Sequence, residues 1–326
     1  SATALCVMNM GATPVMVDVN DDFNINVANI KKAITQKTKV IIPVDIGGWP
    51  CDYDAIMDLV NQKEIISFFK QEGDVQEKLG RILVISDAAH SIGAKYKGSI
   101  TGTATDITVF SLHSVKNITT GEGGAICINL PKPFDNKNTL QYLRYLSLNG
   151  QNKSAFEKSK VGGWRYDIVD QGLKVNMPDI CAAVGLAQIK VYKNKLLPER
   201  KDIFKYYNDY FSKYKWALLP PSINSISESS YHLYMLRIND INEDQRDQMI
   251  EYISSKEVAV NVHYIPMSML TLFKNKGYKI EDYPNTYSLY ANEISLPIYN
   301  NLSKIQLEKI TNTIREAYNS LTSTHE

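Results

Sequence analysis

Three side chains of different chemistry stand near the ends of two strand-like segments. Asp87 comes just after the apolar run 82–85, Ser111 directly follows the segment 107–110, and Lys116 lies shortly beyond Ser111. Ligands of open α/β sheets bind at the carboxyl ends of parallel strands. We therefore expect the three groups to lie close together at the carboxyl ends of neighbouring strands of one sheet. A lysine amine condenses with a carbonyl, a carboxylate keeps a pyridine nitrogen protonated, and a hydroxyl binds phosphate. The pattern therefore matches the chemical needs of pyridoxal 5′-phosphate (PLP).

Lys116 taken alone has a simpler interpretation as a surface lysine in a hairpin. It stands ahead of the glycine-rich segment 121–124, which is followed by an apolar strand-like run over 125–128. Flexible glycines beside a lone lysine suit an amine that must reach a bound molecule. The upstream segment, where two alanines separate Asp87 from His90, is what favours a cofactor site over a surface hairpin.

The two segments together resemble the signature of a known enzyme family. They read Asp-Ala-Ala-His at 87–90 and Phe-Ser-x-His-x-x-Lys-Asn-Ile-Thr-Thr-Gly-Glu-Gly-Gly at 110–124, with Lys116 placed 29 residues after Asp87. This pattern is similar to that of the DegT/StrS family of PLP-dependent sugar-nucleotide aminotransferases. The resemblance extends over nearly the whole chain and includes four further segments, 11–18, 41–44, 182–188 and 296–299.

The resemblance implies an α/β protein with the type I fold of PLP-dependent transferases, which is the fold of aspartate aminotransferase. We expect a large PLP-binding domain over residues 1–200, with a mostly parallel sheet of the seven-stranded type, and a smaller α+β C-terminal domain over 201–326. Residues 13–18 and 40–44 are predicted as strands of the large domain. Relatives carry a phosphate-binding helix start and an aromatic residue that covers the cofactor ring ahead of the position of Ser1, so this N-terminal part is expected to be missing.

The resemblance assigns catalytic or cofactor-binding roles to four residues. Lys116 would hold PLP as an imine and later carry a proton between the amino donor and the cofactor. Asp87 would pair with the pyridine nitrogen, so Lys116 and Asp87 are the predicted catalytic residues. His90 would lie beside the cofactor ring and touch its phenolic oxygen, and Ser111 would bind the phosphate. The ordinary pKa of a lysine is about 10.4, so a neutral amine requires a site that lowers this value.

Lys174 and Asn176 stand just ahead of a helix that is predicted to begin near Asp179. In relatives the segment directly before this helix supplies residues that bind the cofactor phosphate of the neighbouring subunit. The resemblance therefore implies a homodimer with shared active sites, in which both residues bind cofactor. Asn176 is equally typical of a helix cap or a turn.

Two segments are candidates for substrate binding. The polar segment 149–172 is long for a loop inside a compact domain, and it carries Trp164 and Tyr166, which could stack against a nucleotide sugar. A surface loop with an incidental tryptophan explains the same residues equally well. His263 and Tyr264 resemble the family's small-domain segment that borders the substrate cleft.

The sequence gives only weak indications of a functional role for Asp45 and for the remaining histidines. Relatives commonly have histidine in the place of Asp45, whose side chain could line the pocket or serve a turn. For His232 and His325 the sequence predicts nothing beyond ordinary packing or a tail position.

Composition limits the remaining classes of function. The chain has 326 residues, of which 44% are hydrophobic and 22% charged, with a net charge of +1, so neither nucleic acid nor a membrane surface is indicated as a partner. No apolar run approaches the roughly 20 residues of a spanning helix, and the first residues lack the pattern of a signal peptide. The four cysteines have neither zinc nor disulfide spacing. We therefore expect a cytoplasmic protein with reduced cysteines and no metal site.

These expectations define the predicted activity. The protein would move an amino group from glutamate to a keto-sugar nucleotide, such as a UDP- or dTDP-linked 4-keto-6-deoxy sugar, in the synthesis of a surface polysaccharide or glycan. Its partners would be these small-molecule substrates and 2-oxoglutarate. Two alternatives are a related PLP-dependent sugar dehydratase, whose known members carry histidine in place of Lys116, and a catalytically silent homologue with a regulatory or scaffold role.

Overall fold

The computed structural model describes residues 1–323. Its N-terminal half is built on a four-stranded sheet in the order β1 (Val40–Ile41), β2 (Leu83–Asp87), β5 (Ile107–Ser111) and β6 (Gly124–Ile128). β1, β2 and β5 run parallel, and β6 is antiparallel to β5. Asp87 pairs in register with Val109, so the carboxyl ends of β2 and β5 open at the same edge of the sheet. The α/β class with a mostly parallel core is thus confirmed.

The sheet differs from our expectation in its size. The described residues form four of its strands, whereas a seven-stranded type was expected, and residues 13–18 form no strand. This segment is held by contacts from the C-terminal half of the chain: the Asp18 carboxylate accepts hydrogen bonds from the backbone N–H groups of Asn285 and Thr286, at 2.9 and 2.8 Å. Pro14 lacks an N–H group for a strand ladder. The strand prediction for 13–18 is therefore wrong.

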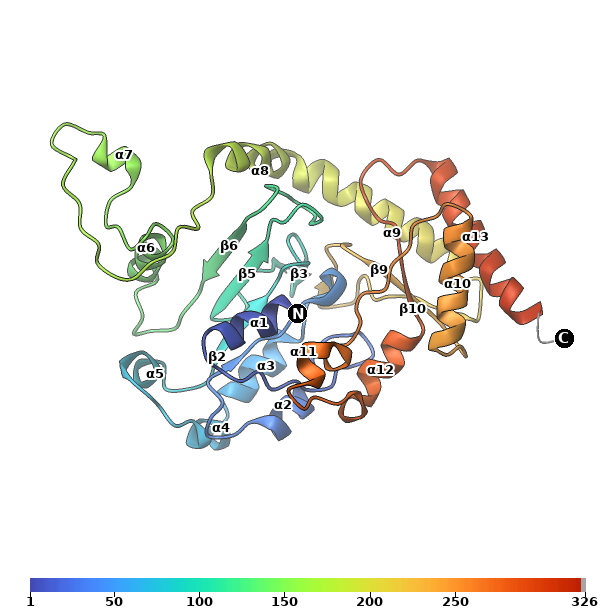
Figure 1. Cartoon of the computed structure of the whole chain (residues 1–326), viewed down its shortest axis with the longest axis horizontal. Coiled ribbons are helices and arrows are strands. Elements are labelled where there is room, and N and C mark those ends of the chain that lie inside the picture. The colour runs from blue at the N-terminus through green and yellow to red at the C-terminus, as the bar shows by residue number, and fades with distance from the viewer. Residues whose placement is uncertain (324–326) are drawn as a thin grey trace.

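Short helices cover the β1–β2 side of this sheet (Figure 1). They are α1 (Ala2–Asn9), α2 (Val27–Ala33), α3 (Tyr53–Val60), α4 (Lys63–Phe68) and α5 (Asp74–Leu79). On α3 the side chains of Ile56, Leu59 and Val60 are all buried, because their spacing puts them on one helix face. They pack with Ile41 of β1 and Val84 of β2 in one apolar core. This core fixes the position of β2 and therefore of Asp87 at its end.

The chain between β6 and the C-terminal half first leaves the body of the molecule. α6 (Asn136–Leu146) and α7 (Ala155–Lys158) belong to this outlying part, and the segment around α7 projects outward in Figure 1. α8 (Asp179–Val191) then returns along the sheet and continues through residues 192–196 into α9 (Leu197–Phe211). A Cβ atom at Gly185 would stand 2.7 Å from the side chain of Thr120, so glycine here lets α8 approach the loop that follows Lys116.

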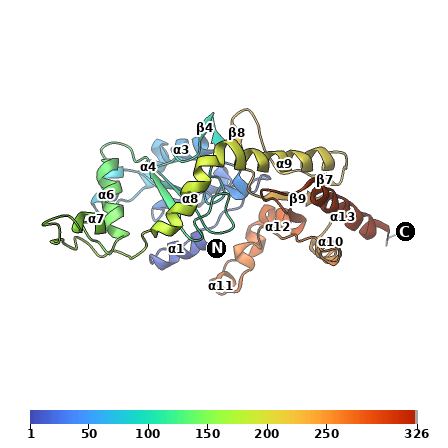
Figure 2. The same cartoon turned by 90° about the horizontal axis from the view of Figure 1, so that it is seen from above.

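The C-terminal half contains an antiparallel sheet in the order β10 (Glu293–Leu296), β9 (Tyr234–Ile238) and β7 (Ala217–Leu218). Its other elements are α10 (Glu243–Ser255), α11 (Thr271–Lys274), α12 (Pro284–Ala291) and α13 (Lys304–Ser323). Figure 2 shows α9, α10 and α13 together at the end of the molecule opposite α6 and α7. Aromatic side chains of α9, Phe204, Tyr207 and Phe211, pack with Tyr234 of β9 in the core of this half.

A small third sheet joins the two halves. It consists of β4 (Ser99–Ile100), β3 (Lys95–Tyr96) and β8 (Ser227–Glu228) in that order. The Glu228 carboxylate accepts from Lys95 and from Lys201 of α9, at 2.7 Å each. This sheet holds residues 229–233, which follow β8, against the turn that follows Asp87. No helix in the described part of the chain combines the length and apolar character needed to cross a bilayer.

A buried ion pair, between Arg81 and Asp106, lies just before β2 and β5, and its loss should be costly. Arg81 donates to both carboxylate oxygens of Asp106 at 2.8 Å, and Asp106 also accepts from the backbone N–H of Val84 at 2.9 Å. Asp106→Ala leaves the buried guanidinium of Arg81 uncompensated, so we expect the free energy of unfolding to fall by about 3–5 kcal/mol. Chemical denaturation measures this loss. The control Asp209→Ala removes an exposed partner of Lys205 and should leave the denaturation midpoint nearly unchanged; equal losses would contradict the prediction.

Candidate active site

Asp87 ends β2, and two donors fix its carboxylate. Oδ2 accepts a hydrogen bond from the hydroxyl of Thr3, on α1, at 2.6 Å, and Oδ1 accepts one from the backbone N–H of Ala89 at 3.1 Å. The backbone carbonyl of Asp87 accepts from the N–H of Asp45 at 3.1 Å, which ties the end of β2 to the turn after β1. Asp87 therefore presents a carboxylate of fixed orientation at the carboxyl edge of the sheet.

His90 lies in the turn after Asp87 and is buried. Its Nδ1 accepts a hydrogen bond from the backbone N–H of Gly47 at 3.3 Å, so the neutral ring carries its proton on Nε2. Nε2 lies 3.2 Å from the hydroxyl of Tyr264. Burial, with smaller effects of Lys116 and His263, lowers the pKa of His90 to about 3. The ring is thus neutral at physiological pH and offers its N–H toward Tyr264.

Lys116 follows β5 in a turn in which its backbone N–H donates to the carbonyl of His113 at 3.0 Å. Within residues 1–323 its Nζ has neither a hydrogen-bond nor an ion-pair partner. Burial lowers the pKa of the Lys116 amine, and the charge of Asp87 opposes part of this effect. A lysine with a depressed pKa spends more time as the neutral amine that attacks a carbonyl.

Tyr264 and His263 come from the C-terminal half of the chain and reach this group of residues. Besides its contact with His90 Nε2, the ring of Tyr264 stacks beside His90 with centroids 6.1 Å apart. Burial and then the charge of Asp87 raise the pKa of Tyr264 to about 12. Burial and then Lys116 lower the pKa of His263 to about 4. The structure therefore brings Asp87, His90, Lys116, His263 and Tyr264 within electrostatic reach of one another.

A buried acid that the sequence did not single out holds the backbone of His263. Glu293 begins β10, is completely buried, and accepts hydrogen bonds from the backbone N–H of His263 at 2.9 Å and from the Ser295 hydroxyl at 2.5 Å. Burial, only partly offset by these bonds and by Arg246, raises the pKa of Glu293 to about 8. The carboxyl group therefore keeps its proton in the folded protein over a range where it is ionised in the unfolded chain.

This raised pKa predicts a pH dependence of stability. The folded state binds the proton of Glu293 up to about pH 8, whereas the unfolded state loses it above its ordinary value, so the contribution of Glu293 falls as pH rises between these two values. Glu293→Gln removes this titration. We expect the difference in unfolding free energy, variant minus wild type, to rise by on the order of 3 kcal/mol from pH 5 to pH 8.5. The exposed control Glu251→Gln should show no such trend, and a flat difference for Glu293→Gln would contradict the prediction.

Ser111 and Asp45 stand at the same edge of the sheet. Ser111 ends β5, is partly buried, and its hydroxyl accepts from the backbone N–H of His113 at 3.3 Å. Asp45 is completely buried and accepts hydrogen bonds from the hydroxyl of Ser91 at 2.6 Å, the hydroxyl of Tyr53 and the backbone N–H of Cys51. Asp45 therefore anchors turns on either side of Asp87, and its burial excludes the role of a pocket wall.

Among residues 1–323 no hydrogen bond, ion pair or ring contact links the other predicted residues to Lys116. Lys174 and Asn176 are exposed and form a hydrogen bond with each other. Trp164 is 69% and Tyr166 51% exposed, and a cation lies over each ring, Arg165 at 5.0 Å and Lys158 at 4.5 Å. All four belong to the stretch between α6 and α8, part of which projects from the body in Figure 1. Within one chain they lie outside the group around Lys116.

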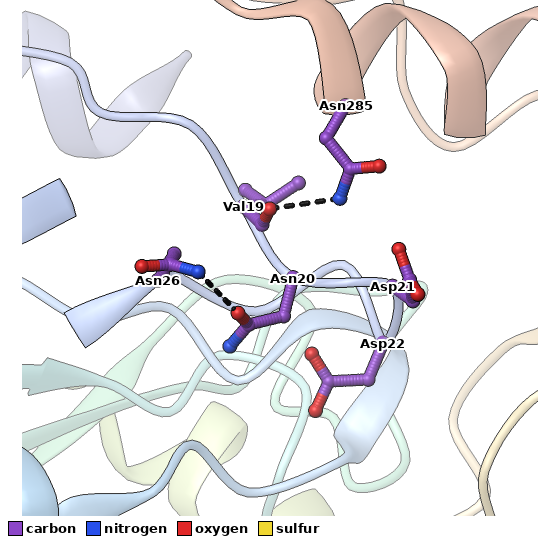
Figure 3. Close-up of a pocket in the computed structure, with 6 residues that line it drawn as sticks. All are labelled: Val19, Asn20, Asp21, Asp22, Asn26 and Asn285. Atoms are coloured by element: carbon purple, nitrogen blue, oxygen red, sulfur yellow. Dashed lines mark hydrogen bonds between the residues drawn. The ribbon is translucent and has the colours of Figure 1, made fainter. Parts of the chain in front are cut away.

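A surface hollow of about 530 Å³ lies elsewhere, and no predicted site residue lines it. It is formed by the turn from Val19 to Asp22 together with Asn26 and by Asn285 of α12 (Figure 3). The amides of Asn26 and Asn285 donate to the side chain of Asn20 and the carbonyl of Val19, at 2.6 and 2.8 Å. The hollow is thus a contact between the two halves of the chain, distinct from the group around Lys116.

Comparison with known proteins supports the resemblance found in the sequence. Residues 1–69 and 74–315 match the DegT/DnrJ/EryC1/StrS aminotransferase family. The solved structure of Spr1654 from Streptococcus pneumoniae in its pyridoxamine phosphate (PMP) form is 37% identical, covers 98% of this chain and 79% of that chain, and superposes with a TM-score of 0.92. Spr1654 has also been solved in a PLP form.

Two curated relatives are similar over most of their length. The spore coat polysaccharide biosynthesis protein SpsC of Bacillus subtilis is 30% identical, over 97% of this chain and 76% of the relative. The UDP-4-amino-4-deoxy-L-arabinose–oxoglutarate aminotransferase of Shewanella sediminis is 29% identical, over 97% of this chain and 77% of the relative.

The chain belongs to the DegT/DnrJ/EryC1/StrS aminotransferase family. It is a PLP-dependent aminotransferase with the type I fold, so the family, fold class, enzyme class and cofactor expected from the sequence are confirmed. The residues around Lys116 fit PLP in their chemistry. They provide an amine without a partner, an oriented carboxylate at Asp87, and the buried Nδ1 of His263, which has no hydrogen-bond partner among the described residues.

Proposed function

We propose that the protein transfers an amino group from glutamate to a keto-sugar nucleotide in the cytoplasm, for the synthesis of a surface polysaccharide or glycan. The observation that carries the proposal is the juxtaposition of Lys116 and Asp87 at one edge of the sheet. In this proposal residues 1–200 form the PLP-binding domain, and residues 201–326 form a smaller domain that contributes His263 and Tyr264.

Lys116 has two tasks in the proposed mechanism. Its Nζ would hold the cofactor through the aldehyde carbon, and bound PLP would supply an electron sink for negative charge at a substrate carbon. With the amino donor bound, the Nζ of Lys116 would accept the proton from the donor Cα. The lowered pKa of Lys116 favours the neutral amine that this proton transfer requires.

Asp87, His90 and Ser111 hold and orient the cofactor. The Asp87 carboxylate would pair with the pyridine nitrogen and keep it protonated, and its bonds to Thr3 and Ala89 fix its orientation. The neutral ring of His90 would lie beside the cofactor ring, and its Nε2–H would donate to the phenolic oxygen. The hydroxyl of Ser111 would donate to the phosphate.

A homodimer completes the site in this proposal. Apolar side chains of α8 are unusually exposed, among them Ile180 at 82%, Leu186 at 55% and Ile189 at 55%. A second copy of the chain that covers this face would bring Lys174 and Asn176 to the cofactor phosphate, and Trp164 and Tyr166 to the sugar nucleotide, of its partner. Mixing an inactive Lys116→Ala chain with an inactive Lys174→Ala/Asn176→Ala chain should then restore activity. Absence of recovery in a confirmed mixed dimer would contradict shared sites.

The substrate class is supported by the relatives. The Shewanella sediminis enzyme is named for a UDP-linked amino sugar and oxoglutarate, and SpsC for polysaccharide biosynthesis. For this chain we propose a UDP- or dTDP-linked 4-keto-6-deoxy sugar as amino acceptor. The test incubates the protein with PLP, glutamate and a panel of 3-keto and 4-keto nucleotide sugars. We expect 2-oxoglutarate and an aminated sugar in equal amounts, with ping-pong kinetics. Loss of water from the sugar without amination would indicate a dehydratase, and no turnover with any member would contradict the proposal.

A further inference from the structure

His232 lies directly behind the residues of the active site. It is buried in the segment that leads from β8 to β9, and its ring faces His90 with centroids 4.4 Å apart. Its Nδ1 lies 2.8 Å from Oδ1 of Asn117, the residue that follows Lys116. His232 therefore touches both the His90 ring and the loop that carries Lys116, although the two lie on different elements.

The direction of the bond between His232 and Asn117 follows from the other partners of Asn117. The amide nitrogen of Asn117 donates to the Ser230 carbonyl at 2.8 Å and to the Tyr192 hydroxyl at 3.3 Å, so its oxygen is the acceptor. His232 Nδ1 must then donate. Burial, reinforced by repulsion from Arg200, from Lys116 and from His90 when it is protonated, lowers the pKa of His232 well below its ordinary value. The ring is thus a neutral donor with its proton on Nδ1.

Arg200 of α9 fixes the backbone around His232. Its Nε donates to the carbonyl of Tyr231 at 3.0 Å and its Nη2 to the carbonyl of His232 at 2.8 Å. Arg200 is buried, and within residues 1–323 it forms no ion pair. Tyr231 adopts a left-handed backbone with φ of 56°, which a non-glycine residue seldom does without support. The guanidinium thus holds a turn that aims the imidazole of His232 at Asn117.

We propose that His232 is a positioning residue, which holds Asn117 by its Nδ1–H and thereby keeps the amine of Lys116 in reach of the cofactor. It acts through Asn117 and touches neither substrate nor cofactor. The proposal rests on the proposed role of Lys116. It predicts that the hydrogen bond of His232, rather than the bulk of its ring behind His90, governs how well Lys116 captures PLP.

The test separates these two contributions. His232→Phe keeps an aromatic ring behind His90 but cannot donate to Asn117, whereas His232→Asn loses the ring and can place an amide N–H near the position of Nδ1. We expect PLP affinity, measured by titration of the cofactor-stripped protein, to fall about tenfold in His232→Phe. It should stay within about twofold of wild type in His232→Asn. The pH midpoint of the visible absorbance of Lys116-bound cofactor should shift only in His232→Phe.

Asn117 provides a second test should His232→Phe fail to fold. Asn117→Ala removes the acceptor and should lower PLP affinity as His232→Phe does, and the double variant should lose no more than either single variant. Asn312→Ala, the control, truncates an exposed asparagine bonded to Tyr210 and should leave affinity unchanged.

The outcomes distinguish this proposal from the proposed function. Wild-type affinity in both His232→Phe and Asn117→Ala, or a larger loss in His232→Asn than in His232→Phe, would overturn the positioning role while the wild type still carries PLP on Lys116. Absence of lysine-bound PLP in the wild type itself would overturn the proposed function instead.

Discussion

Replacing Lys116 with alanine is expected to abolish amino transfer and to remove the visible absorbance of lysine-bound PLP. The variant loses both the amine that binds the cofactor aldehyde and the base that receives the proton of the donor Cα. Proton transfer alone contributes about 10²- to 10⁴-fold, so we expect turnover to fall at least about 10³-fold. Steady-state assays with glutamate and the active keto sugar, together with absorbance spectra, measure both effects.

Two controls sharpen the interpretation of Lys116→Ala. Lys116→Arg keeps a cation in the loop but has no amine that condenses, so it should be as inactive as Lys116→Ala. Lys205→Ala changes an exposed lysine on α9 and should behave as wild type. Because the side chain of Lys116 makes no hydrogen bond or ion pair in the described part of the chain, its loss should leave the thermal midpoint nearly unchanged. Turnover by Lys116→Ala within tenfold of wild type would refute the assignment.

Asp87→Asn is expected to bind cofactor and yet to lose most of its turnover. The amide has the same shape: its oxygen can still accept from the backbone N–H of Ala89, and its NH2 group can donate to the Thr3 hydroxyl, so the fold around the end of β2 should persist. It carries no negative charge to keep the pyridine nitrogen protonated, so the cofactor would be a weaker electron sink. Loss of one preorganised electrostatic partner in an active site commonly costs about 10²- to 10³-fold in kcat, and we expect a loss of this order.

The readout for Asp87→Asn is kcat together with the absorbance of bound PLP. Asp54→Asn is a suitable control, because Asp54 is a surface residue on α3 paired with Lys97, and it should leave kcat unchanged. If Asp87→Asn turned over at the wild-type rate with PLP bound, ring protonation by Asp87 would not be part of the mechanism.

The parts of the site that the sequence could predict are those encoded by local pattern. Asp87 and Ser111 each end an apolar strand, and parallel strands deliver their carboxyl ends to one edge, so their proximity follows from β2 and β5 being neighbours. The structure places His90 and Lys116 within electrostatic reach of each other, while the roles of these residues toward PLP stay predictions. The domain boundary near residue 200 also stays a prediction.

The parts that escaped prediction depend on contacts between distant segments. Thr3 reaches Asp87 within the N-terminal half and His263 reaches Glu293 within the C-terminal half, whereas Asn117 reaches His232 because the two halves pack together. The residue type alone does not show whether a glutamate in a strand such as β10 is buried or exposed. The pattern of hydrophobic residues therefore gave no indication that Glu293 is buried. Likewise the strand predicted over 13–18 has the right composition, but α12 and not a neighbouring strand provides its partners.

The most direct measurement of the central claim is to find the residue that carries the cofactor. Borohydride reduction of the protein with bound PLP, followed by peptide mass spectrometry, fixes the pyridoxyl group on the lysine that holds it. We predict a single modified peptide in which Lys116 carries the group, and its loss in Lys116→Ala. Modification of a different lysine in the wild type, or of none, would contradict the account.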